Sequence, residues 1–370
     1  MSWTVAGAGV AEPVHALLTG YPGFIGRRVA AKLLEGDEDV HITALVESRM
    51  ADQAAKLAQP WGERLEVVVG DIGEPRLGLS DPDWGRLTEA VDTVFHLAAI
   101  YDLAVPLALA QKVNVGGTGN VLDFCLACEG LRRHVYVSTA YVAGTRRGVV
   151  YEHELVLGQD FKNHYESTQF QAEVWVRERM GDIPTTILRP AIVVGDSETG
   201  ETEKFDGPYY LLRSVAQATR HGRPPAQFGR ADAPFNVVPV DYVVAGMVAA
   251  ARDDVMAGET LHLVDPEPLS AHELLTQLSR EYGGRPPKGR IPPWVVANAL
   301  RLSQVRKIFS DTPRESIAYL NHPVAFDTRR AVELLAPHGL RPPNFREYVK
   351  PMVAFFRQHE GDPAYAPKRD

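Results

Sequence analysis

The chain has 370 residues, of which 45% are apolar and 23% are charged, a composition typical of a globular protein with a substantial core. Its formal net charge of −8 argues against a nucleic-acid surface, because binding phosphates requires a clustered excess of Lys and Arg. No run approaches the ~20 apolar residues that span a bilayer, and the first fourteen residues contain no Lys or Arg, unlike a secretory signal. We therefore expect a cytoplasmic protein that acts on small molecules.

Six short apolar segments before residue 200 alternate with helical patterns, which is typical of βα units that build a parallel sheet. They are HALLTG (15–20), VHITALVE (40–47), LEVVVGD (65–71), TVFHLAA (93–99), HVYVSTA (134–140) and TTILRP (185–190). After the first segment, Ile25, Val29 and Leu33 recur every four residues and form one apolar helix stripe. The pattern predicts an α/β fold with a doubly wound parallel sheet, whose ligands bind beyond the carboxyl ends of the strands.

The second half of the chain has a different character. The stretch GDSETGETEKFDGP (195–208) is polar and rich in turn formers, which predicts an excursion on the substrate side. Segments 235–247 and 260–264 are interpreted as returns to the main sheet. The rest predicts a smaller, helix-rich substrate-binding part. The expected organisation is therefore an N-terminal extension (1–13), a dinucleotide-binding domain (14–200, returning at about 235–265) and a cap region (201–234 and 266–370).

A glycine triplet follows the first strand directly. Gly20, Gly23 and Gly26 have the spacing G-x-x-G-x-x-G and enclose Phe24 and Ile25. Glycines at this place permit a tight turn and let backbone N–H groups approach a pyrophosphate at the positive end of the next helix. Because the triplet stands between a strand and an amphipathic helix, it predicts a Rossmann-type dinucleotide site.

Two charged residues follow the second strand, where a dinucleotide-binding fold contacts the adenine ribose. The Glu47 carboxylate can accept hydrogen bonds from both ribose hydroxyls and would repel a 2′-phosphate, which favours NAD(H). Arg49 could bind such a phosphate instead, so NADP(H) stays the alternative.

Two other patterns are interpreted as structural. Cys125 and Cys128 are the only cysteines, and we expect small side chains on a helix rather than a metal or redox site, since no further ligands stand at matching spacing. Segment 291–309 combines apolar and basic residues, which fits a helix at a membrane surface but is more often a helix packed on its own domain. We expect no metal.

Further motifs are spread over most of the chain. They are TGYPGFIG (19–26), Gly70-Asp71-Ile72, His96-Leu97-Ala98-Ala99, Asn114-Val115 with Gly117-Thr118, Val137-Ser138-Thr139, Tyr165, Leu188-Arg189-Pro190, VVPVDYVV (237–244) and FDTRRA (326–331). With these motifs the chain resembles the extended short-chain dehydrogenase/reductases, especially the branch related to fatty-acyl and thioester reductases. The resemblance implies a cofactor site that includes the glycine turn, Asp71 and Ile72 near the adenine, and Leu97, Ala98, Ala99, Asn114, Val137, Tyr165, Pro190 and Ile192.

The resemblance also implies the catalytic groups. Thr139, with Ser138 as the close competitor, would hydrogen-bond the substrate oxygen, and Tyr165 would supply or accept the proton. The chain departs from the family at Gln169, one helical turn after Tyr165, where the family has lysine. A glutamine can reach ribose hydroxyls but brings no charge, so the Tyr165 pKa is expected near the free value of ~10. His164 is an alternative proton relay.

These residues lead to one principal hypothesis and two alternatives. The principal one is an NAD(P)-dependent oxidoreductase of secondary metabolism that reduces a ketone, aldehyde or thioester-derived carbonyl of a hydrophobic, lipid- or polyketide-like substrate. The alternatives are a non-redox dinucleotide-binding protein, with the dinucleotide as signal or structural cofactor, and an isomerase or dehydratase that uses transient hydride transfer. The family resemblance and the apolar residues of segment 111–128 predict a homodimer that pairs through this segment and 163–180.

Overall fold

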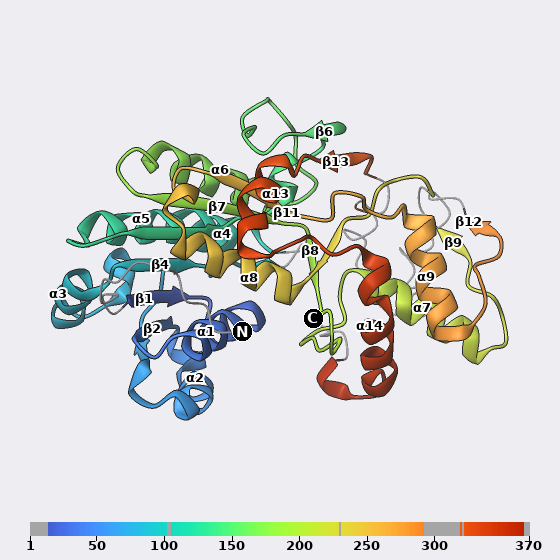
Figure 1. The fold of residues 1–370 in the computed structure, drawn as a ribbon, viewed down its shortest axis with the longest axis horizontal. Helices are drawn as coiled ribbons and strands as arrows, with labels where there is room; N and C mark the ends of the chain where they lie inside the picture. The colour runs from blue at the N-terminus through green and yellow to red at the C-terminus, as the bar shows by residue number, and fades with distance from the viewer. Residues whose placement is uncertain (1–13, 102–104, 229–230, 292–318, 320–321, 366–370) are drawn as a thin grey trace.

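The structure, a computed structural model, describes residues 14–101, 105–228, 231–291, 319 and 322–365 (Figure 1). At its centre is a seven-stranded sheet in the order β11-β7-β5-β4-β1-β2-β3, in which all neighbouring strands are parallel. All six predicted strands are confirmed. The strands are β1 (Val14–Thr19), β2 (Val40–Val46), β3 (Leu65–Val69), β4 (Thr93–His96), β5 (Arg133–Val137), β7 (Thr185–Pro190) and β11 (Thr260–Leu263).

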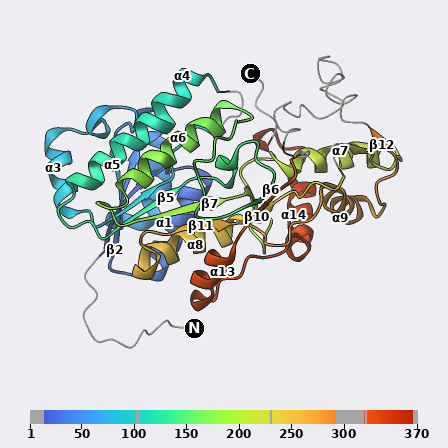
Figure 2. The same cartoon turned by 90° about the horizontal axis from the view of Figure 1, so that it is seen from above.

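Helices cover both faces of the sheet, as the doubly wound pattern predicts (Figure 2). One hydrophobic cluster joins one face to α1 (Phe24–Gly36), α2 (Ala51–Ala58) and α8 (Val240–Arg252). A second cluster joins the other face to α3 (Asp81–Ala90), α5 (Gly117–Ala127) and α6 (His164–Arg179). The short α4 (Leu107–Ala110) and a π-helical turn, Gln111–Gly116, lead into α5. In α1 the predicted stripe is buried at Val29 and Leu33.

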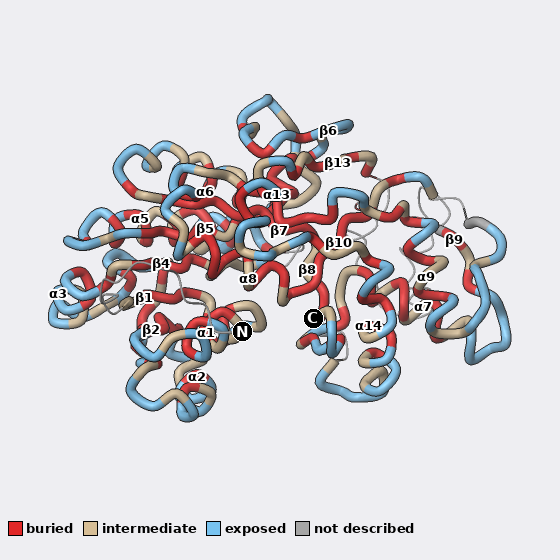
Figure 3. The backbone as a smooth tube through the Cα atoms, in the orientation of Figure 1, coloured by how far each residue is buried: buried red, intermediate tan, exposed pale blue. Residues whose placement is uncertain are grey.

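The C-terminal region packs beside the carboxyl edge of the sheet. It contains α7 (Pro208–Arg220), α9 (Ala271–Gly283), α13 (Arg329–Leu335) and α14 (Phe345–His359). Three two-stranded parallel sheets flank it: β8 (Ile192–Val194) with β10 (Val237–Pro239), β9 (Gln227–Phe228) with β12 (Arg290–Ile291), and β6 (Gly148–Val150) with β13 (Val324–Phe326). Figure 3 shows that buried backbone continues from the main sheet into these helices.

The predicted returns to the main sheet are only partly right. β11 joins the sheet beside β7, as expected for segment 260–264. Segment 235–247 does not add a main-sheet strand, because β10 pairs with β8 and the chain then continues as α8, which packs on α1. The reason is geometric: β11 occupies the place beside β7, and only Val237–Pro239 stay extended before the helix begins.

Two expectations fall on residues that the structure leaves undescribed. The extension 1–13 and most of the amphipathic segment, 292–309, lie outside the described residues. Among the helices that are described, none has the length and apolar character needed to cross a membrane. Cys125 and Cys128 are buried at the C-terminal end of α5, and burial raises the pKa of both thiols.

Candidate active site

The glycine turn has the geometry of a pyrophosphate cradle. Gly20 has a φ of +89°, which favours glycine. A Cβ on Gly23 would lie 2.8 Å from the Gly20 carbonyl oxygen, and one on Gly26 would lie 2.6 Å from it. The first turn of α1 has no acidic residue and no side-chain cap, so its backbone N–H groups face outward for an anion. These residues therefore fit a dinucleotide.

A hydrogen-bonded histidine fixes the chain after β4 against this turn. Thr118 donates to the Asn114 carbonyl oxygen (2.7 Å), so its hydroxyl accepts from His96 Nε2 (3.1 Å). His96 Nδ1 then accepts from Thr19 (2.9 Å), whose oxygen accepts the backbone N–H groups of Leu97 and Ala98. Burial lowers the pKa of His96 to about 4 and keeps the ring neutral. The predicted Leu97-Ala98 segment therefore lies directly beside the glycine turn.

Glu47 and Arg49, the two residues predicted to contact the adenine ribose, contact each other. Arg49 Nε donates to Glu47 Oε2 (2.5 Å), and Arg49 Nη2 donates to Glu47 Oε1 (3.3 Å). Both side chains are exposed at the carboxyl end of β2. Either cofactor must therefore compete with, or exploit, this ion pair.

The other predicted adenine-side residues lie after β3. Asp71 Oδ1 accepts the Gly73 N–H (2.7 Å), which shapes the turn, and the Asp71 side chain stays partly accessible. The Ile72 side chain is buried against α5, where a Cβ on Gly117 would approach it to 2.8 Å. The Asp71 carboxylate thus stays accessible at the carboxyl end of β3, whereas Ile72 packs in the core.

The structure separates the two candidate hydroxyls after β5. Ser138 Oγ donates to the buried Glu173 carboxylate (2.6 Å), which fixes it in the interior. Thr139 instead accepts the Tyr141 N–H (3.3 Å), and its side chain lies close enough to the Tyr165 hydroxyl to favour the phenolate and lower the pKa of that group. The geometry therefore favours Thr139 over Ser138 as the group that meets a substrate oxygen.

The Tyr165 hydroxyl is the centre of the site. Burial raises its pKa to about 12, and the neighbouring Glu166 carboxylate adds to this rise, while hydrogen bonds to Thr139 and Gln169 oppose it. Glu166 is itself buried and paired with Lys162 at 2.8 Å. The expected pKa near ~10 is wrong, because the expectation considered the missing lysine but not the burial of the phenol.

Gln169 is buried between two tyrosines. Its Oε1 accepts a hydrogen bond from Tyr136 of β5 (3.3 Å), and its carboxamide lies close enough to Tyr165 to lower the pKa of that phenol. Gln169 therefore stands one turn from Tyr165 on the same face of α6, as the spacing predicts, but brings no charge. The predicted relay His164 is exposed, and the described hydrogen bonds of this residue use its backbone carbonyl.

Asn114 holds the loop after β4 against α6. Its carboxamide accepts the Ile100 N–H (2.8 Å) and donates to the Ile100 carbonyl (3.1 Å) and to Thr168 (3.0 Å). Asn114 thus links two segments of the site. Its side-chain hydrogen bonds are made within the protein, so Asn114 positions the loop after β4.

The remaining predicted cofactor residues line the same edge. Ala99 follows β4, Val137 ends β5 and Pro190 ends β7, while Ile192 begins β8; Ala99, Val137 and Ile192 are partly accessible and Pro190 is buried. Because the carboxyl ends of parallel strands meet at one edge, these positions lie at the same edge of the sheet as the glycine turn.

Sequence reasoning missed a buried ion pair behind the site. Arg189 donates to both Glu173 oxygens (2.6 and 3.0 Å) and to the carbonyls of Glu152 and Glu154. Arg189 and Glu173 are fully buried. Two features of the sequence could have indicated this ion pair. One is the charged Arg189 inside the apolar run TTILRP, and the other is Glu173, eight residues after Tyr165 on the same helix face.

An acidic strap, defined as residues 196–206, crosses this edge of the sheet. Glu203 pairs with Arg27, and Glu201 pairs with Arg28 (3.2 Å), both on the N-terminal half of α1. At its other end Lys204 hydrogen-bonds to the Tyr101 hydroxyl and lies 4.6 Å from the ring centroid. The strap therefore connects α1 to the chain after β4.

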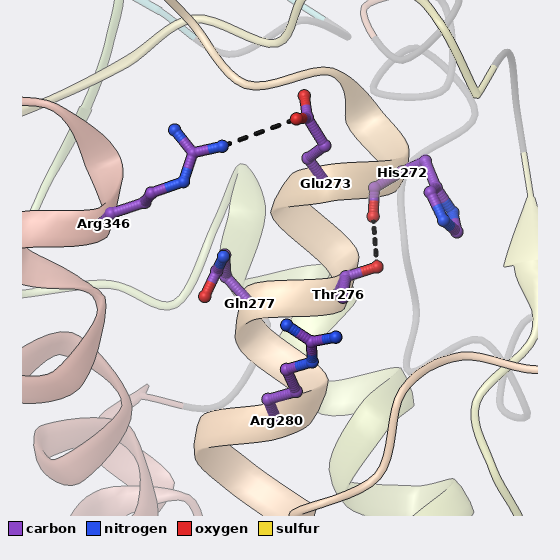
Figure 4. Close-up of a pocket in the computed structure, with 6 residues that line it drawn as sticks. All are labelled: His272, Glu273, Thr276, Gln277, Arg280 and Arg346. Carbon is purple, nitrogen blue, oxygen red and sulfur yellow. Dashed lines mark hydrogen bonds and ion pairs between the residues drawn. The ribbon is translucent and has the colours of Figure 1, made fainter.

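A separate surface pocket lies on α9 and α14, far along the chain from these residues (Figure 4). Its walls include an ion pair between Arg346 and Glu273 (3.4 Å). The lining residues are His272, Glu273, Thr276, Gln277, Arg280 and Arg346. None of them belongs to the predicted site, so the pocket is not the candidate active site.

The parallel sheet and the glycine turn together define a dinucleotide-binding protein of the Rossmann type. Residues 18–247 match the sequence profile of the family described as "Male sterility protein", which spans more than half of the chain. The chain belongs to this NAD-binding family. The predicted likeness to fatty-acyl and thioester reductases is thereby confirmed at the level of the family.

Two relatives show the context in which such chains occur. One component of linear gramicidin synthase from Brevibacillus parabrevis is 28% identical over 285 residues, which cover 72% of this chain and 5% of that protein. The L-2-aminoadipate reductase large subunit of Penicillium chrysogenum is 28% identical over 312 residues, covering 76% of this chain and 21% of that protein. The chain thus spans a small part of each relative.

Solved structures confirm the fold. The terminal R domain from the myxalamid PKS-NRPS biosynthetic pathway superposes with a TM-score of 0.81 at 24% identity, covering 96% of this chain and 94% of that one. The reductase domain of a nonribosomal peptide synthetase from Mycobacterium tuberculosis superposes with a TM-score of 0.70 at 22% identity, covering 95% and 92%.

Proposed function

We propose that the protein is an NAD(P)H-dependent reductase of a hydrophobic carbonyl compound, with Tyr165 as proton donor and Thr139 as the group that orients the carbonyl. The observation that carries the proposal is the approach of the Thr139 side chain to the Tyr165 hydroxyl at the carboxyl edge of the sheet, the edge at which the glycine turn also stands. A hydroxyl pair at this place can bind one oxygen from two sides.

The relatives suggest which carbonyl is reduced. They include proteins named as nonribosomal peptide synthetases and as L-2-aminoadipate reductase, and the myxalamid structure is named as a terminal R domain. We propose a thioester-linked acyl group as the substrate, with a free ketone or aldehyde as the alternative. Reduction of a thioester would release an aldehyde and a thiol.

The chain's own residues would perform the proton chemistry. Bound NAD(P)H would supply the hydride to the carbonyl carbon. Thr139 would hold the carbonyl oxygen, and Tyr165 would donate its proton to that oxygen as negative charge develops there. Because burial raises the pKa of Tyr165 to about 12, the phenol stays neutral at physiological pH, which is the form that reduction needs.

A substrate screen tests the proposal. Purified protein is given NADH or NADPH with acyl thioesters, aldehydes and ketones, and the nicotinamide absorbance is followed. We expect substrate-dependent loss of absorbance. Conversion of a substrate without net cofactor consumption would support an isomerase or dehydratase instead, and cofactor binding without any conversion would support a non-redox sensor or structural role.

The replacement Gln169→Lys should change the pH profile. An ammonium beside the phenol should lower the Tyr165 pKa and raise alcohol oxidation at neutral pH more than carbonyl reduction. The measurement is the rate of both directions against pH. Gln169→Met, of similar length but uncharged, is the control. Identical pH profiles for the Lys and Met variants would contradict the prediction.

Cofactor choice should depend on the Glu47–Arg49 pair. We expect NADH to bind more tightly than NADPH, and Glu47→Gln to weaken that preference by about tenfold or more, because it removes a charged acceptor and releases Arg49 for a 2′-phosphate. Calorimetric titration of both cofactors measures this. Tighter NADPH binding in the unaltered protein, lost in Arg49→Met, would instead assign Arg49 as the reader.

We also propose a homodimer that pairs through α5 and α6. The chain itself buries Val121 and Leu122, so the apolar surface left for a partner is smaller than the sequence suggests. Leu126 and Trp175 remain 44% exposed on these helices. Light scattering should give twice 40.7 kDa, with Trp175→Glu shifting the protein towards monomer. A mass of one chain for the unaltered protein would refute the dimer.

A further inference from the structure

Two adjacent arginines stand in the first half of α1, directly after the glycine turn. Arg27 follows Gly26 and lies one helical turn after Gly23, so the two share one face of the helix. Side chains on a helix lean towards its N-terminus. Arg28 shows this lean, because its guanidinium lies 4.9 Å from the centroid of the Phe24 ring, one turn earlier. The same lean directs the Arg27 side chain towards the end of α1 that carries the glycine turn.

The acidic strap occupies part of the Arg27 guanidinium. Arg27 Nη2 is paired with Glu203 Oε1, whereas Arg27 Nε is buried and has no hydrogen-bond partner among the described residues. Burial raises the pKa of Tyr21, the second residue of the glycine turn, and the nearby Arg27 charge opposes this rise. Arg27 thus carries a positive charge close to the turn, while a carboxylate of the strap holds one of its donors.

The acidic strap is held in place by contacts away from α1. Ser197 donates its N–H and its hydroxyl to the two Asp241 oxygens (2.9 and 2.6 Å), at the start of α8. Gly200 packs against α14, where a Cβ would lie 2.2 Å from a backbone oxygen. Phe205 is buried among aromatic rings of α7 and α14. Glu203 stands between these anchors, so its carboxylate stays near α1 even when its ion pair opens.

The strap brings more negative charge to α1 than the two arginines neutralise. Arg28 pairs with Asp196 (3.5 Å) and Glu201 (3.2 Å), and Arg27 pairs with Glu203, so three carboxylates meet two guanidinium groups. The side chains of Arg27 and Glu203 are 33% and 36% exposed, and an ion pair with this exposure is weak. A pyrophosphate at the glycine turn can therefore displace the Glu203 carboxylate, but the displaced charge remains nearby and repels it.

We propose that Arg27 is a pyrophosphate-binding residue of the cofactor site and that Glu203 competes with the cofactor for it. On cofactor binding, Arg27 exchanges the Glu203 carboxylate for the pyrophosphate. The strap keeps that carboxylate close, so it takes the guanidinium back as the cofactor leaves. Glu203 thereby weakens cofactor binding and speeds cofactor release. The inference rests on the cofactor site and is independent of the proposed reductase chemistry.

Titration of the full chain with NADH, without any carbonyl substrate, tests the competition. Glu203→Gln should bind NADH about three- to fivefold more tightly, and stopped-flow displacement should show that the gain lies mainly in slower release. Arg27→Met should weaken NADH binding, and in that background Glu203→Gln should have little effect. Glu198→Gln is the matched control, because it removes an exposed carboxylate of the same strap whose described contact is made by its backbone N–H. It should bind NADH like the unaltered protein.

Ligands that differ in phosphate content separate this competition from a general effect of charge. ADP-ribose carries the pyrophosphate without the nicotinamide, and adenosine carries no phosphate. Glu203→Gln should tighten ADP-ribose binding as it does NADH binding and leave adenosine affinity unchanged, which also shows that the variant is folded.

Four results would each overturn the inference. They are unchanged or weaker NADH binding in Glu203→Gln, an equal gain in Glu198→Gln, an equal gain for adenosine, and unaltered NADH affinity in Arg27→Met. Absence of turnover with every carbonyl compound would refute the proposed reductase function, and these titrations would still decide the competition between Glu203 and the cofactor.

Discussion

Tyr165→Phe should lower the rate of carbonyl reduction by about 10²–10⁴-fold, the usual contribution of a positioned general acid. The reason is that the substitution removes the proton donor while leaving the aromatic ring in place. NADH affinity should stay close to that of the unaltered protein, since the glycine turn and the chain after β4 are untouched. Single-turnover rates and cofactor titrations on the same preparation separate the two effects.

The control for this substitution is Tyr242→Phe, which removes a buried phenol from α8, on the opposite face of the sheet. It should leave turnover unchanged. If Tyr165→Phe keeps a confirmed activity, Tyr165 is not the acid, and the chemistry must run through another group such as His164.

Glu173→Gln should destabilise the fold by about 3–5 kcal/mol, because it leaves the Arg189 guanidinium buried without its counter-charge. Burial alone would raise the pKa of Glu173, but Arg189, Arg177 and the Ser138 hydroxyl hold it below its ordinary value. A depressed carboxyl pKa stabilises the fold above the unfolded pKa of ~4.3, and this stabilisation is lost as the pH falls through the folded value. Denaturant unfolding at neutral and acid pH measures both effects.

Arg177→Met is the matched comparison for the buried pair. Arg177 also bonds to Glu173, at 3.0 Å, but its side chain is 24% exposed, so its loss should cost much less. If Arg177→Met and Glu173→Gln lowered the free energy of unfolding equally, burial of the unpaired Arg189 charge would not be the main cause of the loss. The Gln variant should also lose less stability than the unaltered protein as the pH falls below ~4.

Local patterns account for the parts of the fold that the sequence predicts. Branched apolar runs bounded by glycine and proline mark the six strands, and the glycine spacing marks the turn, since both depend on residues close together in the chain. The strand predicted at 235–247 fails because sheet neighbours are decided by space beside β7, which no local pattern contains. The periodicity of the sequence likewise does not predict that the acidic strap brings Lys204 to Tyr101.

The candidate site shows the same division. Motif spacing places Tyr165 and Gln169 on one helix face, and the structure agrees. The choice between Ser138 and Thr139 depends on Glu173, which reaches Ser138 across the sheet–helix interface. The pKa of Tyr165 depends on how deeply its hydroxyl is buried. Both are tertiary properties, so residues near these positions in sequence give no information about them.

One hydrophobic cluster extends without interruption from β1 and α1 through α8 to α7, α9 and α14. Regions that share a packed core lose it together, so the dinucleotide-binding part and the C-terminal helices should melt in a single cooperative transition. Removing α14 would take away Phe345, Tyr348 and Phe356 and would expose the apolar residues that pack against them. The C-terminal helices are thus part of the folding unit and not a detachable lid, and shortened chains that end before α14 should be degraded or aggregate rather than bind cofactor.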